Sequence, residues 1–176
     1  MKTLTENLSQ YADYHQDARN IATHFVGVPM IVLAVVILLS RPVFMLGGWP
    51  LTPAILMMLP VLVYYLRMDL RFGAVMVALF AVCAWVAAQT VACSTSAWLA
   101  WGVGLFGVGW AIQFIGHYCE GRKPAFVDDV IGMLIGPLFI VAEAAFGLGL
   151  RLEVRQAMRL GSTNANPLPS HTPTVV

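Results

Sequence analysis

Apolar stretches of membrane-crossing length dominate this sequence. Four of them lie at about residues 21–40, 51–66, 72–92 and 97–115, each bounded by charge, glycine or proline. The hydrocarbon core of a bilayer is about 30 Å thick, so a helix needs about 20 apolar residues to cross it. A helix also satisfies its own backbone hydrogen bonds, as lipid requires. The chain is therefore predicted to be an all-α integral membrane protein with four transmembrane helices.

Composition supports this class and excludes others. Of the 176 residues, 59% are hydrophobic and 11% are charged, whereas about 25% of the residues in a soluble domain are charged. The formal net charge is +1, so the chain lacks the basic surface with which proteins bind nucleic acid. The first twenty residues are polar, which argues against a cleavable signal peptide. The lipid bilayer is the expected surrounding, and nucleic acid is not an expected partner.

The last apolar block, residues 131–150, is less regular than the others. Gly136-Pro137 lies near its middle, and Glu143 places an ionisable group inside it. Proline removes one helix hydrogen bond and clashes with the preceding turn. The block is therefore predicted to form either a fifth helix or a re-entrant helical hairpin that breaks at Gly136-Pro137.

Three regions follow from this pattern. Residues 1–20 are predicted to form an N-terminal helix at the cytoplasmic face that contributes to the functional site. Residues 21–150 form the membrane helical domain. Residues 151–176 are polar and contain several Ser, Thr, Asn and Pro residues, so this tail is predicted to be largely disordered.

Basic residues in the loops predict the orientation, because Lys and Arg in short loops favour the cytoplasmic side. With a cytoplasmic N-terminus, that side carries Lys2, Arg19, Arg67, Arg71, Arg122 and Lys123. The opposite side carries Arg41. The functional site is thus expected at the cytoplasmic face. A bacterial inner membrane is favoured, or the endoplasmic reticulum in a eukaryote, because the short chain has no obvious retention signal.

Three histidines share one face in the predicted topology. His15 and His24 flank the start of the first span, and His117 follows the fourth. Glu120 lies about 60° around a helix from His117, hence on the same side. An uninterrupted helix would place His15 and His24 on opposite faces, about 13.5 Å apart. A bend between them, or a site between helices, is therefore required if they act together.

Such a cluster indicates either a metal or haem site, because imidazole is the commonest metal ligand, or three hydrogen-bonded packing residues. Three histidines with a carboxylate suit non-haem iron, zinc and manganese equally well on ligand type. The sequence GVGLFG at 102–107 formally matches a dinucleotide-binding pattern, but it lies inside an apolar span with no preceding strand. Its glycines are predicted to pack helices together.

Two histidine-containing patterns resemble those of a known family. The first is Tyr11-x3-His15-x4-Asn20-x3-His24-x2-Gly27-x-Pro29. The second is Gln113-Phe114-x-Gly116-His117-x2-Glu120-x3-Pro124-Ala125, and Tyr65-x3-Asp69-x3-Gly73 lies between them. Together they resemble the Mpo1-like family, formerly a domain of unknown function. The resemblance extends over about residues 11–150 and leaves out the tail.

The resemblance implies an Fe(II)-dependent dioxygenase of fatty acid α-oxidation. Its substrates would be O2 and a 2-hydroxy long-chain fatty acid, and its product the acid one carbon shorter. Carried over residue by residue, it implies His15, His24 and His117 as iron ligands. Glu120 would be a fourth ligand or a catalytic carboxylate beside the metal.

Two further catalytic candidates come from the same resemblance. Asn20 precedes His24 by one helical turn, so it could orient that imidazole or touch substrate, and a capping or packing role is the alternative. Asp69 could act at the site or pair with Arg67 or Arg71 in its own loop.

Two other functions stay open on the sequence. Two of the histidines could be the axial ligands of a haem in a membrane electron-transfer protein. The histidines and Glu120 could also pair with one another in a non-catalytic membrane scaffold. The sequence does not determine the oligomeric state.

Overall fold

The computed structural model describes residues 2–121 and 131–165, with side chains described as far as residue 160. This part of the chain forms seven helices and one hairpin, in the order α1 (Leu4–Asp13), α2 (Ala18–Leu38), β1 (Phe44–Leu46), β2 (Trp49–Leu51), α3 (Pro53–Met68), α4 (Leu70–Val91), α5 (Thr95–Glu120), α6 (Ile131–Gly147) and α7 (Leu152–Ala165). Arg122 and Lys123, which contribute to the predicted orientation, lie outside the described residues.

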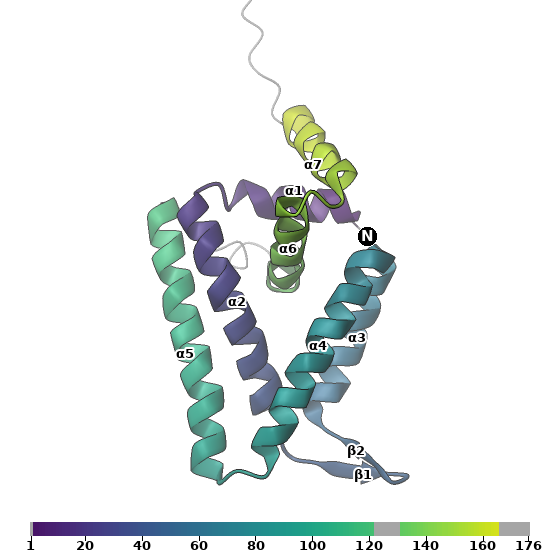
Figure 1. Ribbon diagram of the computed structural model, residues 1–176, viewed down its shortest axis with the longest axis vertical. Helices are drawn as coiled ribbons and strands as arrows, with labels where there is room; N and C mark the ends of the chain where they lie inside the picture. Colours follow the sequence, from purple (N-terminus) through teal and green to yellow (C-terminus); the bar gives the residue numbers. More distant parts are fainter. Residues whose placement is uncertain (1, 122–130, 166–176) are drawn as a thin grey trace, which may run out of the picture.

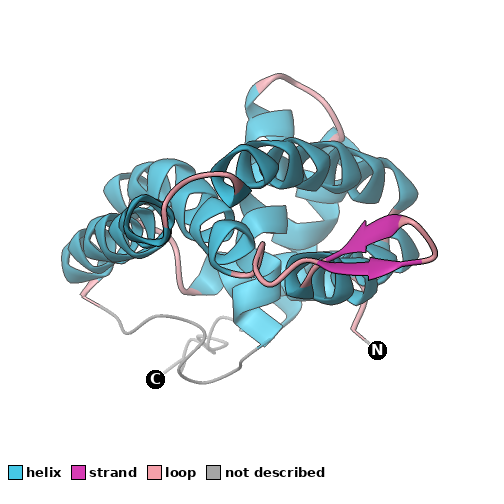
Figure 2. Ribbon diagram, turned by 90° about the horizontal axis from the view of Figure 1, so that it is seen from below, coloured by secondary structure: helices cyan, strands magenta, loops and turns pink. Residues whose placement is uncertain are grey.

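The four consecutive helices α2 to α5 define the shape of the molecule (Figure 1). The helices α2 and α5 lie on one side and α3 and α4 on the other, and the chain runs alternately up and down through them. The short helix α1 lies across one end, next to α7, and α6 descends between the two helix pairs at that same end. The hairpin closes the opposite end, from which Figure 2 views the molecule.

Three of the four predicted spans have membrane-crossing length. The helices α2, α4 and α5 have 21, 22 and 26 residues and are apolar enough to cross a bilayer. By contrast, α3 has 16 residues, about 24 Å at 1.5 Å per residue, which is less than a hydrocarbon core of about 30 Å. The prediction of a helical membrane protein is confirmed, but the span expected over 51–66 is shorter than a full crossing.

A small β-hairpin departs from the all-α prediction. Its strands pair antiparallel, with Leu46 opposite Trp49. Gly47 and Gly48 join the strands with φ angles of 57° and 86°, which a two-residue hairpin turn requires and glycine adopts freely. Residue 51 therefore ends a strand, and α3 begins after Thr52, whose side chain accepts a hydrogen bond from the first turn.

The break in the last apolar block lies further along the chain than predicted. The helix α6 continues through Pro137, because a proline removes only one hydrogen bond and the rest of the helix is retained. The chain turns instead at Gly149 and Arg151, with φ angles of 75° and 54°. The helices α6 and α7 form a pair bent by 115°. The prediction of a hairpin that breaks at Gly136-Pro137 is therefore wrong.

The segment after this turn is more ordered than predicted. Residues 152–165 form α7, which packs against α1 and in which Val154 and Met158 are buried in the same apolar cluster as Leu4 and Leu8. Ser9 of α1 also donates a hydrogen bond to the carbonyl of Met158. Apolar residues four positions apart form one apolar face of a helix. The average composition of the tail is polar, so it does not reveal this face. Disorder is thus the wrong prediction for residues 152–165, and residues 166–176 lie outside the described chain.

Glycines let α2 and α5 approach closely beside the histidines. A Cβ on Gly27 would lie 2.9 Å from the carbonyl oxygen of Gly109, and a Cβ on Gly102 or Gly116 would collide with side chains of α2. Helices in lipid pack closely through such small residues. The packing role predicted for the glycines of 102–107 holds for Gly102, whereas Gly104 and Gly107 face open space. The contact holds the start of α2 beside the end of α5.

An ion pair ties the α3–α4 corner to the α6–α7 turn. Asp69 caps α4 through a hydrogen bond from the backbone of Phe72. Both of its oxygens accept hydrogen bonds from Arg151, at 2.9 and 2.7 Å. The Arg151 guanidinium holds the pKa of Asp69 below its usual value and lies over the Phe72 ring. Asp69 thus pairs with Arg151 rather than with Arg67 or Arg71.

We expect Asp69→Ala to lower the free energy of unfolding in detergent by about 2 kcal/mol, because it removes a helix cap and a charged hydrogen-bond pair that is mostly buried. Asp69→Asn keeps the capping oxygen and should lose less. Thermal unfolding followed by circular dichroism measures both, with Arg67→Gln as the control for a charge change in the same corner. Equal melting temperatures in all four proteins would contradict this role.

Candidate functional site

The chain turns sharply between α1 and α2, and this turn carries His15. The backbone N–H of His15 still bonds to Ala12, at 2.9 Å, so His15 lies just past the end of α1. Asp17 then caps α2 by accepting a hydrogen bond from the backbone of Arg19. Because the two helices are separate, His15 folds back onto His24. The predicted bend between these two histidines is confirmed.

His15 and His24 face each other through their Nε2 atoms, which lie 3.0 Å apart. The Nδ1 atom of His15 lies 2.8 Å from the carbonyl oxygen of Tyr11, and that of His24 lies 2.8 Å from the carbonyl oxygen of Asn20. A carbonyl only accepts hydrogen bonds, so both Nδ1 atoms carry the proton. In the neutral rings the two Nε2 lone pairs therefore point at each other. They need a cation or one additional proton between them.

His117 completes the cluster from the last turn of α5. The three rings are buried, with 3%, 2% and 7% of their residue surface exposed for His15, His24 and His117. One nitrogen from each lies within 4.8 Å of the others. Two nitrogens at right angles on one metal are about 3.0 Å apart and two on opposite sides about 4.2 Å, for metal–nitrogen bonds of about 2.1 Å. The cluster thus has nearly the dimensions of a three-histidine metal site.

Unpaired polar atoms gather at this place. In the described part of the chain, three buried side-chain atoms have no hydrogen-bond partner: Nδ1 of His117, Oδ1 of Asn20 and Oε1 of Gln113. Buried polar atoms nearly always have a partner, so such exceptions point to an ion, a ligand or a water. The unpaired nitrogen of His117 fits a metal bound by the three histidines.

Burial also keeps His15 in the form that binds metals. Removal from water lowers the pKa of His15 below its ordinary value of 6.5, and this outweighs the opposite effect of its hydrogen bond to Tyr11 and of the nearby Glu120. A neutral imidazole offers a lone pair, whereas an imidazolium does not. The ring is therefore neutral at physiological pH.

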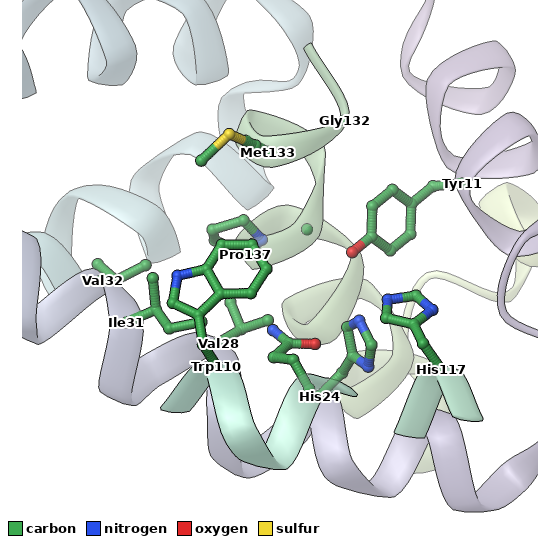
Figure 3. A pocket seen from close by; sticks show the side chains of 12 residues that line it. Tyr11, His24, Val28, Ile31, Val32, Trp110, His117, Gly132, Met133 and Pro137 are labelled. Atoms are coloured by element: carbon green, nitrogen blue, oxygen red, sulfur yellow. The ribbon is translucent and has the colours of Figure 1, made fainter. Parts of the chain in front are cut away.

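A pocket that is partly open to its surroundings lies next to the histidines, between α2, α5 and α6. One end is polar, where His24, His117 and the hydroxyl of Tyr11 meet (Figure 3). The remaining walls are mostly apolar and include Val28, Ile31, Val32, Trp110, Met133 and Pro137. The pocket thus fits an amphipathic molecule with its polar group at the histidines.

Tyr11 supports the site in two ways that the sequence did not indicate. Its ring stacks on His15, with centroids 4.2 Å apart and the planes 5° from parallel, and its carbonyl fixes the tautomer of that histidine. Its hydroxyl points into the pocket (Figure 3). Gly136 leaves room for this hydroxyl, since a Cβ there would lie 3.0 Å from it. Burial raises the pKa of Tyr11 far above its usual range, so the hydroxyl remains a donor.

Glu120 binds the backbone of the α1–α2 turn. Its carboxylate accepts hydrogen bonds from the backbone N–H groups of Gln16 and Asp17, at 2.8 to 3.1 Å, and from the side-chain amide of Asn20 at 3.2 Å. It is not one of the three groups whose ligand atoms converge. In this arrangement Glu120 fixes the turn that carries His15.

The structure separates the other two predicted catalytic residues. Asn20 is fully buried beside the cluster, where its backbone carbonyl accepts the Nδ1 proton of His24 and its side-chain amide donates a hydrogen bond to Glu120. Asp69 belongs to the ion pair with Arg151 and is neither in the histidine cluster nor in the pocket lining. Asn20 is thus placed to orient His24, and Asp69 to join helices.

Comparisons with known proteins agree with this geometry. A family model described as 2-hydroxy-palmitic acid dioxygenase Mpo1-like matches residues 1–148. The chain belongs to the Mpo1-like family. The curated protein 2-hydroxy-palmitic acid dioxygenase MPO1 of Saccharomyces cerevisiae is 43% identical over 49 residues, which are 27% of this chain and 28% of the yeast protein. No solved structure matches the chain.

The matched region of this Mpo1-like protein contains all three clustered histidines and both residues that the sequence did not single out for chemistry. These are Tyr11 and Gln113, and both line the pocket. Gln113 precedes His117 by four residues, so the two share one face of α5. Tyr11 and Gln113 also begin the two family patterns in the sequence. Those positions were the available signal, but a tyrosine or glutamine in a helix has many other roles.

We expect the metal-free protein to lose thermal stability as the pH falls below about 6.5. The unfolded chain takes up a proton on His15 near its ordinary pKa of 6.5, whereas the buried ring resists it until a lower pH. The stability that depends on a neutral His15 is therefore present above this window and decreases through it. Melting temperatures from pH 8 to pH 5 in the presence of a chelator measure the effect. His15→Gln should give a shallower slope, and an unchanged slope would exclude His15 as a source.

Glu120→Gln should lower the melting temperature and leave the metal stoichiometry unchanged. Glutamine has one acceptor oxygen and cannot receive both backbone N–H groups and the Asn20 amide, so the turn that holds His15 loosens. Metal content per chain and thermal unfolding are the measurements, with the exposed Glu153→Gln as the matched control. Complete loss of metal with unchanged stability would instead make Glu120 a ligand.

Proposed function

We propose that this protein is an integral-membrane, Fe(II)-dependent dioxygenase of fatty acid α-oxidation. It converts a 2-hydroxy long-chain fatty acid and O2 into the fatty acid one carbon shorter. The observation that carries the proposal is the position of three buried histidine nitrogens, within 4.8 Å of one another, at the polar end of an otherwise apolar pocket. Membership of the Mpo1-like family and the name of the yeast relative support the substrate class.

His15, His24 and His117 would hold the iron in this proposal. When bound, iron with open coordination positions brings the carboxylate and hydroxyl of the substrate together with O2. The carbonyl groups of Tyr11 and Asn20 hold the protons of His15 and His24 on Nδ1 and so keep their Nε2 atoms available. Hydrogen bonds of this kind fix the ligand orientation and commonly matter for metal affinity.

The pocket residues bind and position the fatty acid. The acyl chain lies against Val28, Val32 and Met133, and each buried CH2 contributes about 0.8 kcal/mol. This arrangement shields the acyl chain from water and leaves the carboxylate and hydroxyl at the histidines. The hydroxyl of Tyr11 is a donor at this polar end and is placed to bind a carboxylate oxygen. The apolar walls also exclude water from the reacting atoms.

The proposed reaction balances without another reductant. A 2-hydroxy acid and O2 yield the shorter acid, carbon dioxide and water. The bond between C1 and C2 breaks, C2 is oxidised from an alcohol to a carboxylic acid, and C1 is released as carbon dioxide. The four electrons from the two carbons reduce O2 to the level of water, and its oxygen atoms enter the products.

The geometry favours this function over the haem alternative. Two axial haem ligands lie on opposite faces of the porphyrin, with their nitrogens about 4 Å apart for iron–nitrogen distances of about 2 Å. The Nε2 atoms of His15 and His24 are 3.0 Å apart and converge directly on each other. This spacing argues against a haem held between His15 and His24.

The site is proposed to face the cytoplasm. His15 follows α1, His24 lies in the first two turns of α2, and His117 lies in the last turn of α5. These helix ends lie where α1 crosses the long helices (Figure 1). Arg19, Arg67 and Arg71 lie in the terminal turns of α2, α3 and α4 at that end, whereas Arg41 follows α2 at the hairpin end. This asymmetry favours a cytoplasmic site. A bacterial inner membrane is the proposed location, with the endoplasmic reticulum as the alternative in a eukaryote.

Purified protein should contain about one iron per chain and consume O2 when 2-hydroxypalmitate is added. Pentadecanoic acid, identified by mass spectrometry, is the expected product. His15→Ala, His24→Ala and His117→Ala should each lower turnover by more than about 100-fold, because a three-ligand site that loses one ligand holds its metal weakly.

Tyr118→Phe is the matched control for this experiment. Tyr118 is the neighbour of His117 but is 88% exposed, so its substitution should change neither iron content nor turnover. Unchanged product formation in one histidine variant would remove that residue from the site. Iron-free protein that turns over at the full rate would overturn the metal-dependent mechanism.

A further inference from the structure

Gln113 has a side chain that the proposed metal site does not account for. The residue is 6% exposed, its Oε1 has no hydrogen-bond partner, and it lines the pocket together with His24, His117 and Trp110. Burial of an amide oxygen without a partner costs about 1–3 kcal/mol. A polar side chain in such a position indicates a ligand that supplies the missing hydrogen bond.

The packing of α2 against α5 makes room for this glutamine. A Cβ on Gly27 would lie 3.0 Å from Cγ of Gln113 and 2.9 Å from the carbonyl of Gly109. The glutamine side chain therefore lies directly over the bare backbone of α2. Its position is fixed by the contact between the helices, so a ligand meets a side chain that is already oriented.

The position of Gln113 in the pocket corresponds to the second carbon of the substrate rather than to the rest of the acyl chain. It lies one helical turn, about 6 Å along α5, from His117. Beyond it in the same direction, Trp110 belongs to the apolar wall. Gln113 thus stands between the histidines that would hold the metal and the walls that would hold the chain.

An amide is complementary to an α-hydroxy acid. Its oxygen accepts one hydrogen bond and its nitrogen donates two, while the substrate presents a hydroxyl donor next to carboxylate acceptors. At neutral pH the carboxylate has no proton to donate, so the hydroxyl is the group that satisfies Oε1. The pairing persists if the amide oxygen and nitrogen exchange places, because the hydroxyl also accepts.

We propose that Gln113 binds the 2-hydroxyl group of the fatty acid and makes the site select 2-hydroxy acids over unsubstituted ones. This inference rests on the proposed function and names the residue that recognises the 2-hydroxyl group, which that reaction requires. An unsubstituted acid leaves the buried amide unpaired. A site that hydrogen-bonds a substrate hydroxyl discriminates strongly for this reason.

The test compares the binding of 2-hydroxypalmitate and palmitate to purified protein in detergent, by calorimetry. A chelator removes any preference that a metal adds. We expect wild-type protein to bind the 2-hydroxy acid about tenfold more tightly. Gln113→Leu should bring this ratio to about one and change palmitate binding little. Gln113→Glu keeps an acceptor oxygen but adds a negative charge that repels the carboxylate. It should weaken the binding of both acids and retain the preference for the 2-hydroxy acid.

Gln89→Leu is the matched control, because Gln89 is an exposed glutamine of α4 that bonds to its own helix. Gln113→Met carries the same test if Gln113→Leu fails to fold. A preference that survives both apolar substitutions, in protein whose wild type turns over 2-hydroxypalmitate, overturns this inference and leaves the proposed function intact. If the apolar substitutions of Gln113 weaken the binding of both acids equally, Gln113 has a structural role, and this result also overturns the inference. A wild type with neither turnover nor preference overturns the proposed function and the inference together.

Discussion

The arrangement of this protein depends on two imidazoles whose Nδ1 protons are bound to backbone carbonyls one helical turn earlier. Those two hydrogen bonds, from His15 to Tyr11 and from His24 to Asn20, direct both Nε2 lone pairs into the same buried space. The two Nε2 atoms are 3.0 Å apart, and their lone pairs repel each other unless a positive charge lies between them. The surrounding helices must therefore hold the rings together against this repulsion. A cation bound between the two nitrogens would replace the repulsion with an attraction to both.

Close packing of α2 and α5 supplies the required rigidity. Glycines at Gly27, Gly109 and Gly116 let the two backbones approach, which brings His117 to the histidines of the first helices. Glu120, at the end of α5, then accepts hydrogen bonds from two backbone N–H groups of the turn between α1 and α2 and holds that turn in place. One helix thus provides the third clustered histidine, the pocket glutamine and the carboxylate that holds the turn carrying His15. A change in the contact between α2 and α5 would affect all three.

The pocket relates this polar cluster to the membrane. Its apolar walls come from α2 and α5, which are long and apolar enough to cross a bilayer, and from α6. Its polar end is formed by Tyr11, His24 and His117 (Figure 3). A lipid substrate could reach such a site without leaving the apolar phase. The carboxylate and hydroxyl would remain at the polar end, where desolvation is compensated by specific partners.

The sequence by itself determined the membrane class, three of the spans and the three histidines, because apolar block length and ligand type are local properties. It also required a bend between His15 and His24, because helix geometry forbids their contact otherwise. Only the tertiary structure decided that Glu120 clamps a turn and that Asp69 pairs with Arg151. It likewise showed that Pro137 lies within a helix and that 152–165 forms α7. The partners in these cases are separated by up to 149 residues, and their meeting depends on helix packing that no local pattern encodes.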